Sequence, residues 1–189
     1  MSRVLILFAT IDGQTARIAG RVADVLRGKG HDVVTRPARA ANAADDASCF
    51  DGVIVGGGIR YGKYAKYLAP TVARCVKPLN SPTAFFSVCL SADGPGARPM
   101  TAQGYVEEFL NDTGWQPSLV ESFGGALLYQ RYDAFTRFMM RMIVRFAGGE
   151  TDTSRDYEYT NWKAVERFAN DFAVRLEVAH AAEPALAAG

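Results

Sequence analysis

The chain has 189 residues, 49% of them hydrophobic and 22% charged, and a formal net charge of +1. That length suits one domain with a substantial core, and the charge balance argues against a general nucleic-acid binder and against a strongly acidic electron carrier. Three cysteines without Cys-x-x-Cys spacing predict neither a disulfide framework nor a zinc site, so we expect a reducing compartment. We expect no signal peptide, and no run approaches the roughly 18 apolar residues of a membrane span.

Short apolar runs alternate with helical patterns along the chain. The predicted strands cover residues 4–9, 31–36, 51–56, 82–89 and 118–127, and the predicted helices cover residues 13–27, 64–76, 101–111 and 160–178. Pro70 requires that its helix either begins near it or kinks there, and Thr101 is the expected N-cap of the helix that follows it.

Three further segments connect or end these elements. Residues 38–48 are Ala-rich and indicate at most a short helix, with Asn42 or Asp45 as its cap. Residues 91–99 form a Gly/Pro-rich loop, and residues 179–189 are expected to be a frayed, flexible tail. We therefore expect a single domain over residues 1–178.

This alternation predicts an α/β fold with a doubly wound, five-stranded parallel sheet. Right-handed crossovers restrict the sheet to a few strand orders, and in the expected order 2-1-3-4-5 three loops at the carboxyl edge come together. In such sheets a ligand binds beyond the carboxyl ends of the strands, where the winding reverses. The loops after strands one, three and four leave those ends, at residues 10–15, 56–62 and 87–96. One loop can hold a phosphate, and the other two can enclose a flat ring.

The loop after the first strand resembles an anion site at a helix N-terminus. The first backbone N–H groups of a helix lack intrahelical partners and favour an anion, Gly13 permits close approach of the backbone, and the hydroxyls of Thr10 and Thr15 add donors. The charge of Asp12 would repel a phosphate, so we expect Asp12 to be a turn residue or cap whose side chain points away from the site. A plain polar turn remains the alternative. The predicted phosphate-loop residues are Thr10, Asp12, Gly13, Gln14 and Thr15.

The two ring loops are less specific. Tyr61 is the candidate for stacking on a flat ring, with an ordinary surface tyrosine after a glycine turn as the alternative. Backbone groups near Cys89 can face the ring edge, and Cys89 itself is expected to be a small buried hydrophobe rather than a nucleophile. The predicted ring-loop residues are Gly58, Ile59, Arg60, Tyr61, Ser87, Val88, Cys89 and Leu90, with Gly124 and Gly125 on the fifth strand.

No Ser/His/Asp set, clearly spaced carboxylate pair or metal cluster stands out in the sequence. His31 begins the second strand and His180 lies in the tail, so neither is a good catalytic candidate. An enzyme built on this chain would therefore need a cofactor to carry its chemistry.

An insert at about residues 128–156 is longer than a connection in such a fold needs. Its helical stretch, residues 131–146, has an apolar face formed by Phe135, Phe138, Met139, Met142, Ile143 and Phe146. Asp133, Arg137, Arg141 and Arg145 recur every four residues on the opposite face. This pattern suits a membrane-interface helix or a lid over an apolar anionic substrate. The alternative is a helix whose apolar face packs on its own domain. Gly148 and Gly149 are expected to end it.

Four stretches of the chain resemble the flavodoxin-like, quinone-dependent protoporphyrinogen oxidases. They are the loop Thr10-Ile11-Asp12-Gly13-Gln14-Thr15, the run Ile59-Arg60-Tyr61-Gly62-Lys63-Tyr64, the Arg/Phe/Met helix, and Gly148-Gly149-Glu150-Thr151-Asp152-Thr153. The likeness covers about residues 3–176. It implies a flavodoxin-like sheet with a long helical insert after strand five.

The resemblance further implies an FMN enzyme of heme synthesis that oxidises protoporphyrinogen IX and passes electrons to menaquinone or ubiquinone. It implies a cytoplasmic protein on the inner face of the cell membrane, touching an anionic lipid surface, and leaves a homo-oligomer open. No residue is assigned to catalysis, because the flavin carries the chemistry. The candidates for substrate propionates or lipid are Arg131, Arg137, Arg141 and Arg145.

Other classes remain open at this point. They are an FMN-dependent NAD(P)H:quinone reductase, a flavodoxin-type electron carrier, and a membrane-associated FMN-binding protein of structural role. Oxidation of NADPH would favour the first, and reduction by a ferredoxin-type reductase without porphyrinogen turnover would favour the second.

Overall fold

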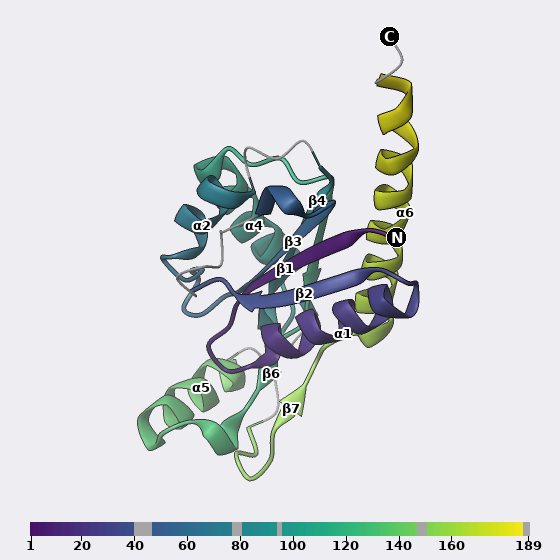
Figure 1. The fold of residues 1–189 in the computed structure, drawn as a ribbon. Coiled ribbons are helices and arrows are strands. Elements are labelled where there is room, and N and C mark those ends of the chain that lie inside the picture. Colours follow the sequence, from purple (N-terminus) through teal and green to yellow (C-terminus); the bar gives the residue numbers. More distant parts are fainter. Residues whose placement is uncertain (40–46, 77–80, 94–95, 147–150, 187–189) are drawn as a thin grey trace.

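A five-stranded parallel sheet forms the centre of the molecule, in the strand order β2-β1-β3-β4-β5 (Figure 1). The computed structural model describes residues 1–39, 47–76, 81–93, 96–146 and 151–186. The strands are β1 (Arg3–Ala9), β2 (Asp32–Pro37), β3 (Gly52–Gly58), β4 (Thr83–Val88) and β5 (Leu119–Phe123). The predicted doubly wound sheet and its strand order are confirmed.

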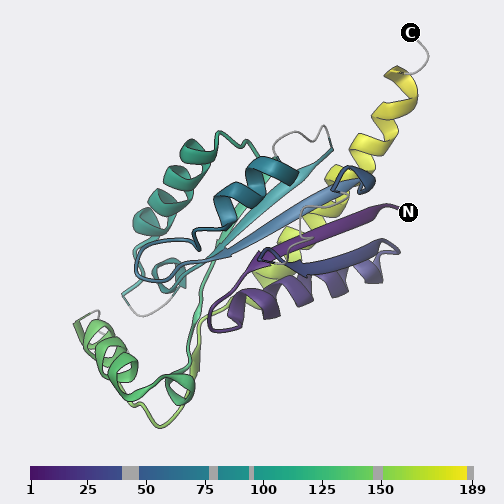
Figure 2. The ribbon, with the colours of Figure 1, turned by 60° about the vertical axis from the view of Figure 1, so that its left-hand side comes forward.

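Helices cover both faces of this sheet (Figures 1 and 2). One face carries α1 (Gln14–Gly28) and α6 (Trp162–Leu186), and the other carries α2 (Leu68–Cys75) and α4 (Pro99–Thr113). Alternate residues of β1 belong to the two hydrophobic layers. Val4 and Ile6 face α1 and α6, whereas Leu5 and Leu7 face the other side of the sheet. Both faces are therefore apolar, as a buried parallel sheet requires.

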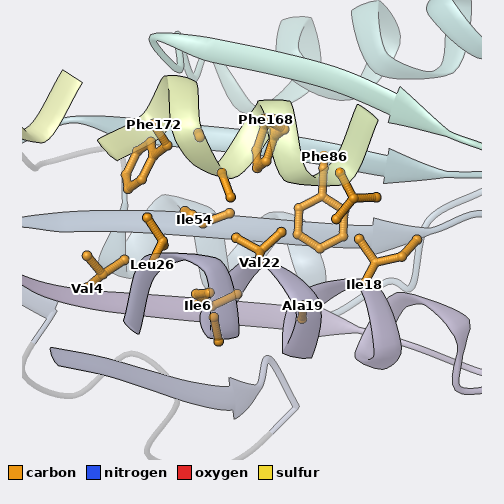
Figure 3. Close-up of a cluster of buried hydrophobic side chains, with 14 of the residues drawn as sticks. Val4, Ile6, Ile18, Ala19, Val22, Leu26, Ile54, Phe86, Phe168 and Phe172 are labelled. Carbon is orange, nitrogen blue, oxygen red and sulfur yellow. The ribbon is translucent and has the colours of Figure 1, made fainter. Parts of the chain in front are cut away.

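The two cores differ in character. Under α1 and α6 mainly aliphatic side chains meet Phe86, Phe168 and Phe172, as Figure 3 shows. On the opposite face Phe85 stacks on Phe109, with ring centroids 5.1 Å apart. All these side chains are buried, so the sheet provides a rigid base for the loops at its carboxyl edge.

The insert lies beyond the carboxyl ends of the strands (Figure 2). It consists of β6 (Ala126–Leu127), the 3-10 turn η2 (Tyr129–Arg131), α5 (Ala134–Phe146) and β7 (Tyr157–Glu158). β7 pairs antiparallel with β6, so the chain segments that enter and leave the insert lie side by side. A small core of Leu127, Tyr129 and Val144 holds α5 on this base.

Two predicted strand ends are wrong. The fifth strand is not continuous over residues 118–127: β5 ends at Phe123, and β6 pairs with β7 outside the main sheet. Gly124 permits this departure, because a Cβ there would lie 2.4 Å from the carbonyl oxygen of Tyr159. The third strand continues to Gly58 instead of ending at Gly56, since Gly57 and Gly58 still pair with β4.

The helix predictions also need correction. Of the two readings of Pro70, the first is confirmed: α2 begins at Leu68, which puts Pro70 in its first turn. Thr101 is not an N-cap, because α4 begins at Pro99, whose fixed φ suits the first helical position. The short helix α3 (Leu90–Asp93) occupies part of the loop predicted at 91–99.

The C-terminal helix does not end at Val178. α6 continues to Leu186, so residues 179–186 are helical rather than a frayed tail. The suggested caps Asn42 and Asp45 and the suggested helix end at Gly148 and Gly149 lie outside the described residues. Across the described part of the chain, no helix is both long and apolar enough to cross a bilayer.

Candidate functional site

A cleft of about 260 Å³ opens where the loops after β1, β3 and β4 meet the insert. Twelve of the predicted cofactor residues line it: Thr10, Asp12, Gln14, Thr15, Gly58, Ile59, Arg60, Tyr61, Val88, Cys89, Leu90 and Gly125. Gly13, Ser87 and Gly124 are not part of the lining described for this cleft. The sheet topology therefore brings three loops that are far apart in the sequence to one site, as expected for this winding.

The loop at residues 10–15, called the anion cradle below, has a geometry that suits an anion. Gly13 has φ 94°, a left-handed conformation that glycine adopts without cost, and its N–H donates to the Thr10 hydroxyl at 3.0 Å. In the described structure no side chain caps α1, and the Arg17 N–H, bonded to the Gly13 carbonyl at 3.1 Å, is the first to enter the helical ladder. The N–H groups of the first turn are therefore left to bind an anion.

Asp12 does not point away from the site, which corrects the prediction. It lines the cleft, and its Oδ1 lies 3.7 Å from a terminal nitrogen of Arg60. The negative charge that would repel a phosphate is thus balanced by the arginine of the neighbouring loop.

Glycine is required where the β3 loop approaches the phosphate loop. A Cβ on Gly58 would lie 2.7 Å from the Thr15 hydroxyl, so a larger residue would push the two loops apart. The turn that follows is closed by a pair of hydrogen bonds between the backbones of Arg60 and Lys63. This turn fixes the direction of the residues at its tip.

Tyr61 lies at the rim of the cleft and is 69% exposed. Its φ of 52° is left-handed, which is uncommon for a residue other than glycine and often marks a functional position. The Arg60 guanidinium lies 5.4 Å from the centre of the Tyr61 ring. An exposed aromatic ring held by a strained backbone suits the predicted stacking role.

The β4 loop provides the opposite side of the cleft. Ser87 is fully buried inside β4 and accepts a hydrogen bond from the Tyr64 hydroxyl at 2.8 Å, so its side chain serves the core. Burial raises the pKa of the Tyr64 phenol and of the Cys89 thiol, which keeps both groups protonated near neutral pH. Cys89 is thus a buried, poorly nucleophilic side chain.

Gly124 joins the insert to the sheet. Its N–H donates to the Asp93 carboxylate at 3.2 Å, and its carbonyl accepts from the Thr160 hydroxyl at 2.8 Å. Gly125 follows and lines the cleft, with its N–H donating to the Cys89 carbonyl.

The sequence suggested the insert helix as a lid, but it did not identify the insert residues that line the cleft. Tyr132, Thr136 and Met140 line the cleft, together with Tyr105 of α4 and Ile11 of the phosphate loop. Thr136 and Met140 lie one turn apart on α5, and Tyr132 lies in the extended backbone just before that helix. The Phe, Met and Arg pattern of the insert gives no sequence signal for these three positions.

The insert arginines lie in different environments. Arg137 donates from Nε to the Tyr129 carbonyl at 2.9 Å and from a terminal nitrogen to the Tyr132 carbonyl at 3.1 Å, so it anchors α5 to η2. Arg141 and Arg145 are exposed, and none of these three is in the lining described for the cleft. The side chain of Arg131 lies outside the described residues.

The large apolar residues of α5 do not cover their own domain. Phe135, Phe138 and Phe146 are 74%, 61% and 83% exposed, whereas Val144 on the other side is 3% exposed. The alternative in which this apolar face packs on its own domain is therefore wrong for the three phenylalanines. Among the described residues no group of three or more His, Cys, Asp or Glu could hold a metal ion.

A polar clasp ties the insert to the phosphate loop. Gln14, the first residue of α1, donates from Nε2 to Glu158 and to Thr160, both at 2.8 Å. Arg17 donates to the Glu158 carboxylate at 3.2 Å and to the Gln14 amide oxygen at 3.0 Å. The return strand of the insert is thus bonded to the helix whose N-terminus forms the anion site.

Comparisons with known proteins agree with this geometry. A family model described as a flavodoxin domain matches residues 5–154. An Escherichia coli K12 protein named protoporphyrinogen IX dehydrogenase [quinone] is 37% identical over 172 residues, which cover 90% of this chain and 94% of that protein. A Leishmania major protein of the same name is 36% identical, over 90% of this chain and 74% of its own length.

Solved structures show the same fold at low identity. Oxidised flavodoxin 1 from Bacillus cereus aligns with a TM-score of 0.56 at 16% identity, over 91% of this chain and 97% of its own. A Pseudomonas aeruginosa flavodoxin aligns with a TM-score of 0.54 at 16% identity, over 93% of this chain and 99% of its own. The chain therefore belongs to the flavodoxin-domain family and, within it, to the family of the quinone-dependent protoporphyrinogen IX dehydrogenases.

Proposed function

We propose that this protein binds FMN and oxidises protoporphyrinogen IX to protoporphyrin IX, with electrons passed to a membrane quinone. The observation that carries the proposal is the cleft itself: an anion cradle, an exposed tyrosine and a wall from the insert converge on one space. Relatives that carry this activity in their names align along 90% of the chain.

The residues of the cleft fit FMN. The first turn of α1 and the hydroxyl of Thr15 would hold the phosphate, and Gly58 leaves room beside that hydroxyl. Tyr61 on one side and the backbone at Val88, Cys89 and Leu90 on the other would enclose the ring. FMN, when bound, supplies a two-electron acceptor, so the six-electron oxidation of the macrocycle requires three rounds.

The work of the protein is then positioning. The apolar surfaces of Ile11, Tyr61, Tyr132 and Met140 suit a flexible apolar macrocycle and would displace water from it. With the thiol of Cys89 protonated and buried, no covalent step through this residue is needed.

We further propose that α5 rests in the surface of an anionic membrane. Phe135, Phe138 and Phe146 project from the domain, and Arg141 and Arg145 are exposed beside them. Burying a phenylalanine side chain is worth about 1.5–3 kcal/mol, and a cation near anionic lipid about 1 kcal/mol. That placement would bring the cleft close to a lipid-soluble quinone.

The decisive test begins with the purified protein. An oxidised-flavin absorbance spectrum after FMN addition, followed by anaerobic turnover of protoporphyrinogen IX with a quinone, is the expected result. A folded protein that takes up no FMN contradicts the cofactor assignment. NADPH oxidation without porphyrinogen turnover would instead favour a quinone reductase, and reduction by a ferredoxin-type reductase alone would favour an electron carrier.

A variant without the insert helix tests the role of the insert. Replacing residues 131–146 by a Gly/Ser linker removes Tyr132, Thr136 and Met140 from the wall while leaving the anion cradle in place. We expect FMN to be retained and porphyrinogen oxidation to be lost. Full activity with bound FMN would contradict a role for the insert.

A further inference from the structure

The charges that line the cleft are few and close together. Among the described residues of its lining, Arg60 is the one cation and Asp12 the one carboxylate. The arginines of α5 with described side chains, Arg137, Arg141 and Arg145, are not in that lining. An anionic group that enters the cleft would therefore meet the β3 loop rather than the insert helix.

The structure holds the Arg60 guanidinium in a defined position. Its side chain is about one third exposed, at 34%, and the group lies 5.4 Å from the Tyr61 ring centre. The backbone of Arg60 is pinned by its two hydrogen bonds with Lys63. A stacked, partly desolvated guanidinium is well suited to bind a carboxylate through two parallel N–H groups.

Asp12 is a loosely held partner for this arginine. The 3.7 Å between Asp12 Oδ1 and the Arg60 nitrogen exceeds a normal hydrogen-bond length. Asp12 also belongs to the loop that would hold a phosphate, where a second negative charge is unfavourable. A carboxylate in the cleft can therefore replace Asp12 at Arg60 without breaking a tight ion pair.

We propose that Arg60 binds a carboxylate of the substrate, and that Asp12 is the counter-ion which the substrate displaces. This inference rests on the proposed function, since protoporphyrinogen carries two propionates on an apolar ring. It assigns substrate recognition to the β3 loop, next to the proposed stacking residue Tyr61, and not to the exposed arginines of α5. Asp12 then lowers the affinity for anions and aids the release of the dianionic product.

The test compares the diacid substrate with its dimethyl ester, which has the same ring and no charge. With FMN at saturation, Arg60→Gln is expected to lower kcat/KM for the diacid about tenfold or more, because a hydrogen bond to a charged group is lost, and to change the ester less than twofold. Arg60→Lys should recover part of the diacid rate. Asp12→Asn should lower KM for the diacid and leave the ester unchanged.

Two further variants and one binding measurement complete the design. Arg74→Gln, an exposed arginine of α2, is the matched control, and Arg141→Gln tests the rival site. The proposal would be overturned if the ratio of kcat/KM for the diacid to kcat/KM for the ester were unchanged in Arg60→Gln, or if it changed in Arg141→Gln alone. It would also be overturned by a raised FMN Kd in Arg60→Gln without a change of this ratio, because Arg60 would then serve the phosphate.

The failure of the proposed function has its own signature. If the wild-type holoprotein turns over neither diacid nor ester, the oxidase activity is refuted. Quenching of protoporphyrin IX fluorescence still measures binding in that case. A diacid affinity that falls in Arg60→Gln, with an unchanged ester affinity, supports carboxylate binding by Arg60, whereas equal affinities in both proteins contradict it.

Discussion

Single residues at the loop junctions determine how closely the two cofactor loops approach. Gly58 is the clearest case, because the space that a Cβ would need is taken by the Thr15 hydroxyl at 2.7 Å. Thr15 is a buried, β-branched residue and cannot move aside as a long flexible side chain would.

Gly58→Ala is therefore expected to raise the FMN Kd about tenfold or more, since a loss of roughly 1.4 kcal/mol in binding corresponds to a factor of ten. Quenching of flavin fluorescence on titration measures the Kd. Gly104→Ala is the matched control, because no heavy atom lies within 4 Å of a Cβ at Gly104. Equal Kd values for the two variants would show that the junction tolerates the methyl group.

Cys49 and Cys89 differ in burial, so we expect them to differ in reactivity. Burial raises the pKa of Cys89, so little of the reactive thiolate forms at pH 8, whereas Cys49 is exposed. We expect iodoacetamide at pH 8 to label Cys49 well before Cys89, as followed by peptide mass spectrometry. A raised folded-state pKa also means that Cys89 contributes stability below its unfolded pKa and loses that contribution as the pH rises through the folded value. Faster labelling of Cys89 would indicate an accessible thiolate in the cleft.

At the scale of elements, the clasp between α1 and β7 couples the insert to the anion site. Thr160 is buried, donates to the Gly124 carbonyl and accepts from the Gln14 amide, so its hydroxyl joins three segments. Removing that hydroxyl deprives the Gln14 amide and the Gly124 carbonyl, both buried, of a hydrogen-bond partner.

Thr160→Val should lower the free energy of unfolding by about 1–3 kcal/mol, which is the usual cost of an unsatisfied buried group. It should also speed hydrogen exchange in β6 and β7, because the insert loses part of its attachment. Urea unfolding and exchange mass spectrometry measure the two effects. Thr35→Val, at an exposed position of β2, is the control and should change neither. Exchange in β6 and β7 that stays at the wild-type rate would show that the clasp does not hold the insert.

The helix α5 presents its two faces to different surroundings, so substitutions on each should have different effects. Phe135→Ser with Phe138→Ser should weaken binding to vesicles that contain anionic lipid and leave the free energy of unfolding nearly unchanged, because both side chains are already exposed. Val144 is buried in the insert core, so Val144→Ala should instead lower the free energy of unfolding by roughly 1–3 kcal/mol. Vesicle sedimentation and urea unfolding separate the two. Undiminished sedimentation of the double variant would contradict the membrane proposal.

For the whole molecule, binding of FMN adds stability by mass action. At a free FMN concentration of about 100 times Kd, binding should raise the free energy of unfolding by roughly 2.7 kcal/mol. For a domain of this size, that increase raises Tm by about 5–10 °C. The variant with residues 131–146 replaced should keep most of this shift, because the anion cradle lies on the sheet. Differential scanning measures both proteins with and without FMN. Loss of the shift in the variant would place the insert among the determinants of FMN binding.

Much of the architecture could be read from local patterns. The apolar runs, the glycine at position 13 and the proline at position 70 each act on their own neighbourhood, so their effects were predictable without knowledge of distant contacts. Two of the errors arose where distant segments meet. The predicted strand at 118–127 is interrupted because β6 pairs with β7 of the returning chain, and Asp12 faces Arg60 of another loop.

The sequence alone determined which segments are strands and helices and which loop begins α1, because apolar runs, helical periodicity and backbone propensity are local properties. Only the tertiary structure decided which side of α5 is covered, since Val144 is buried and Phe138 is exposed on a helix that carries apolar residues on more than one side. The same holds for the cleft charges: contacts between separate loops put Arg60 and Asp12 there, whereas α5, packed through Val144, keeps Arg141 and Arg145 outside it.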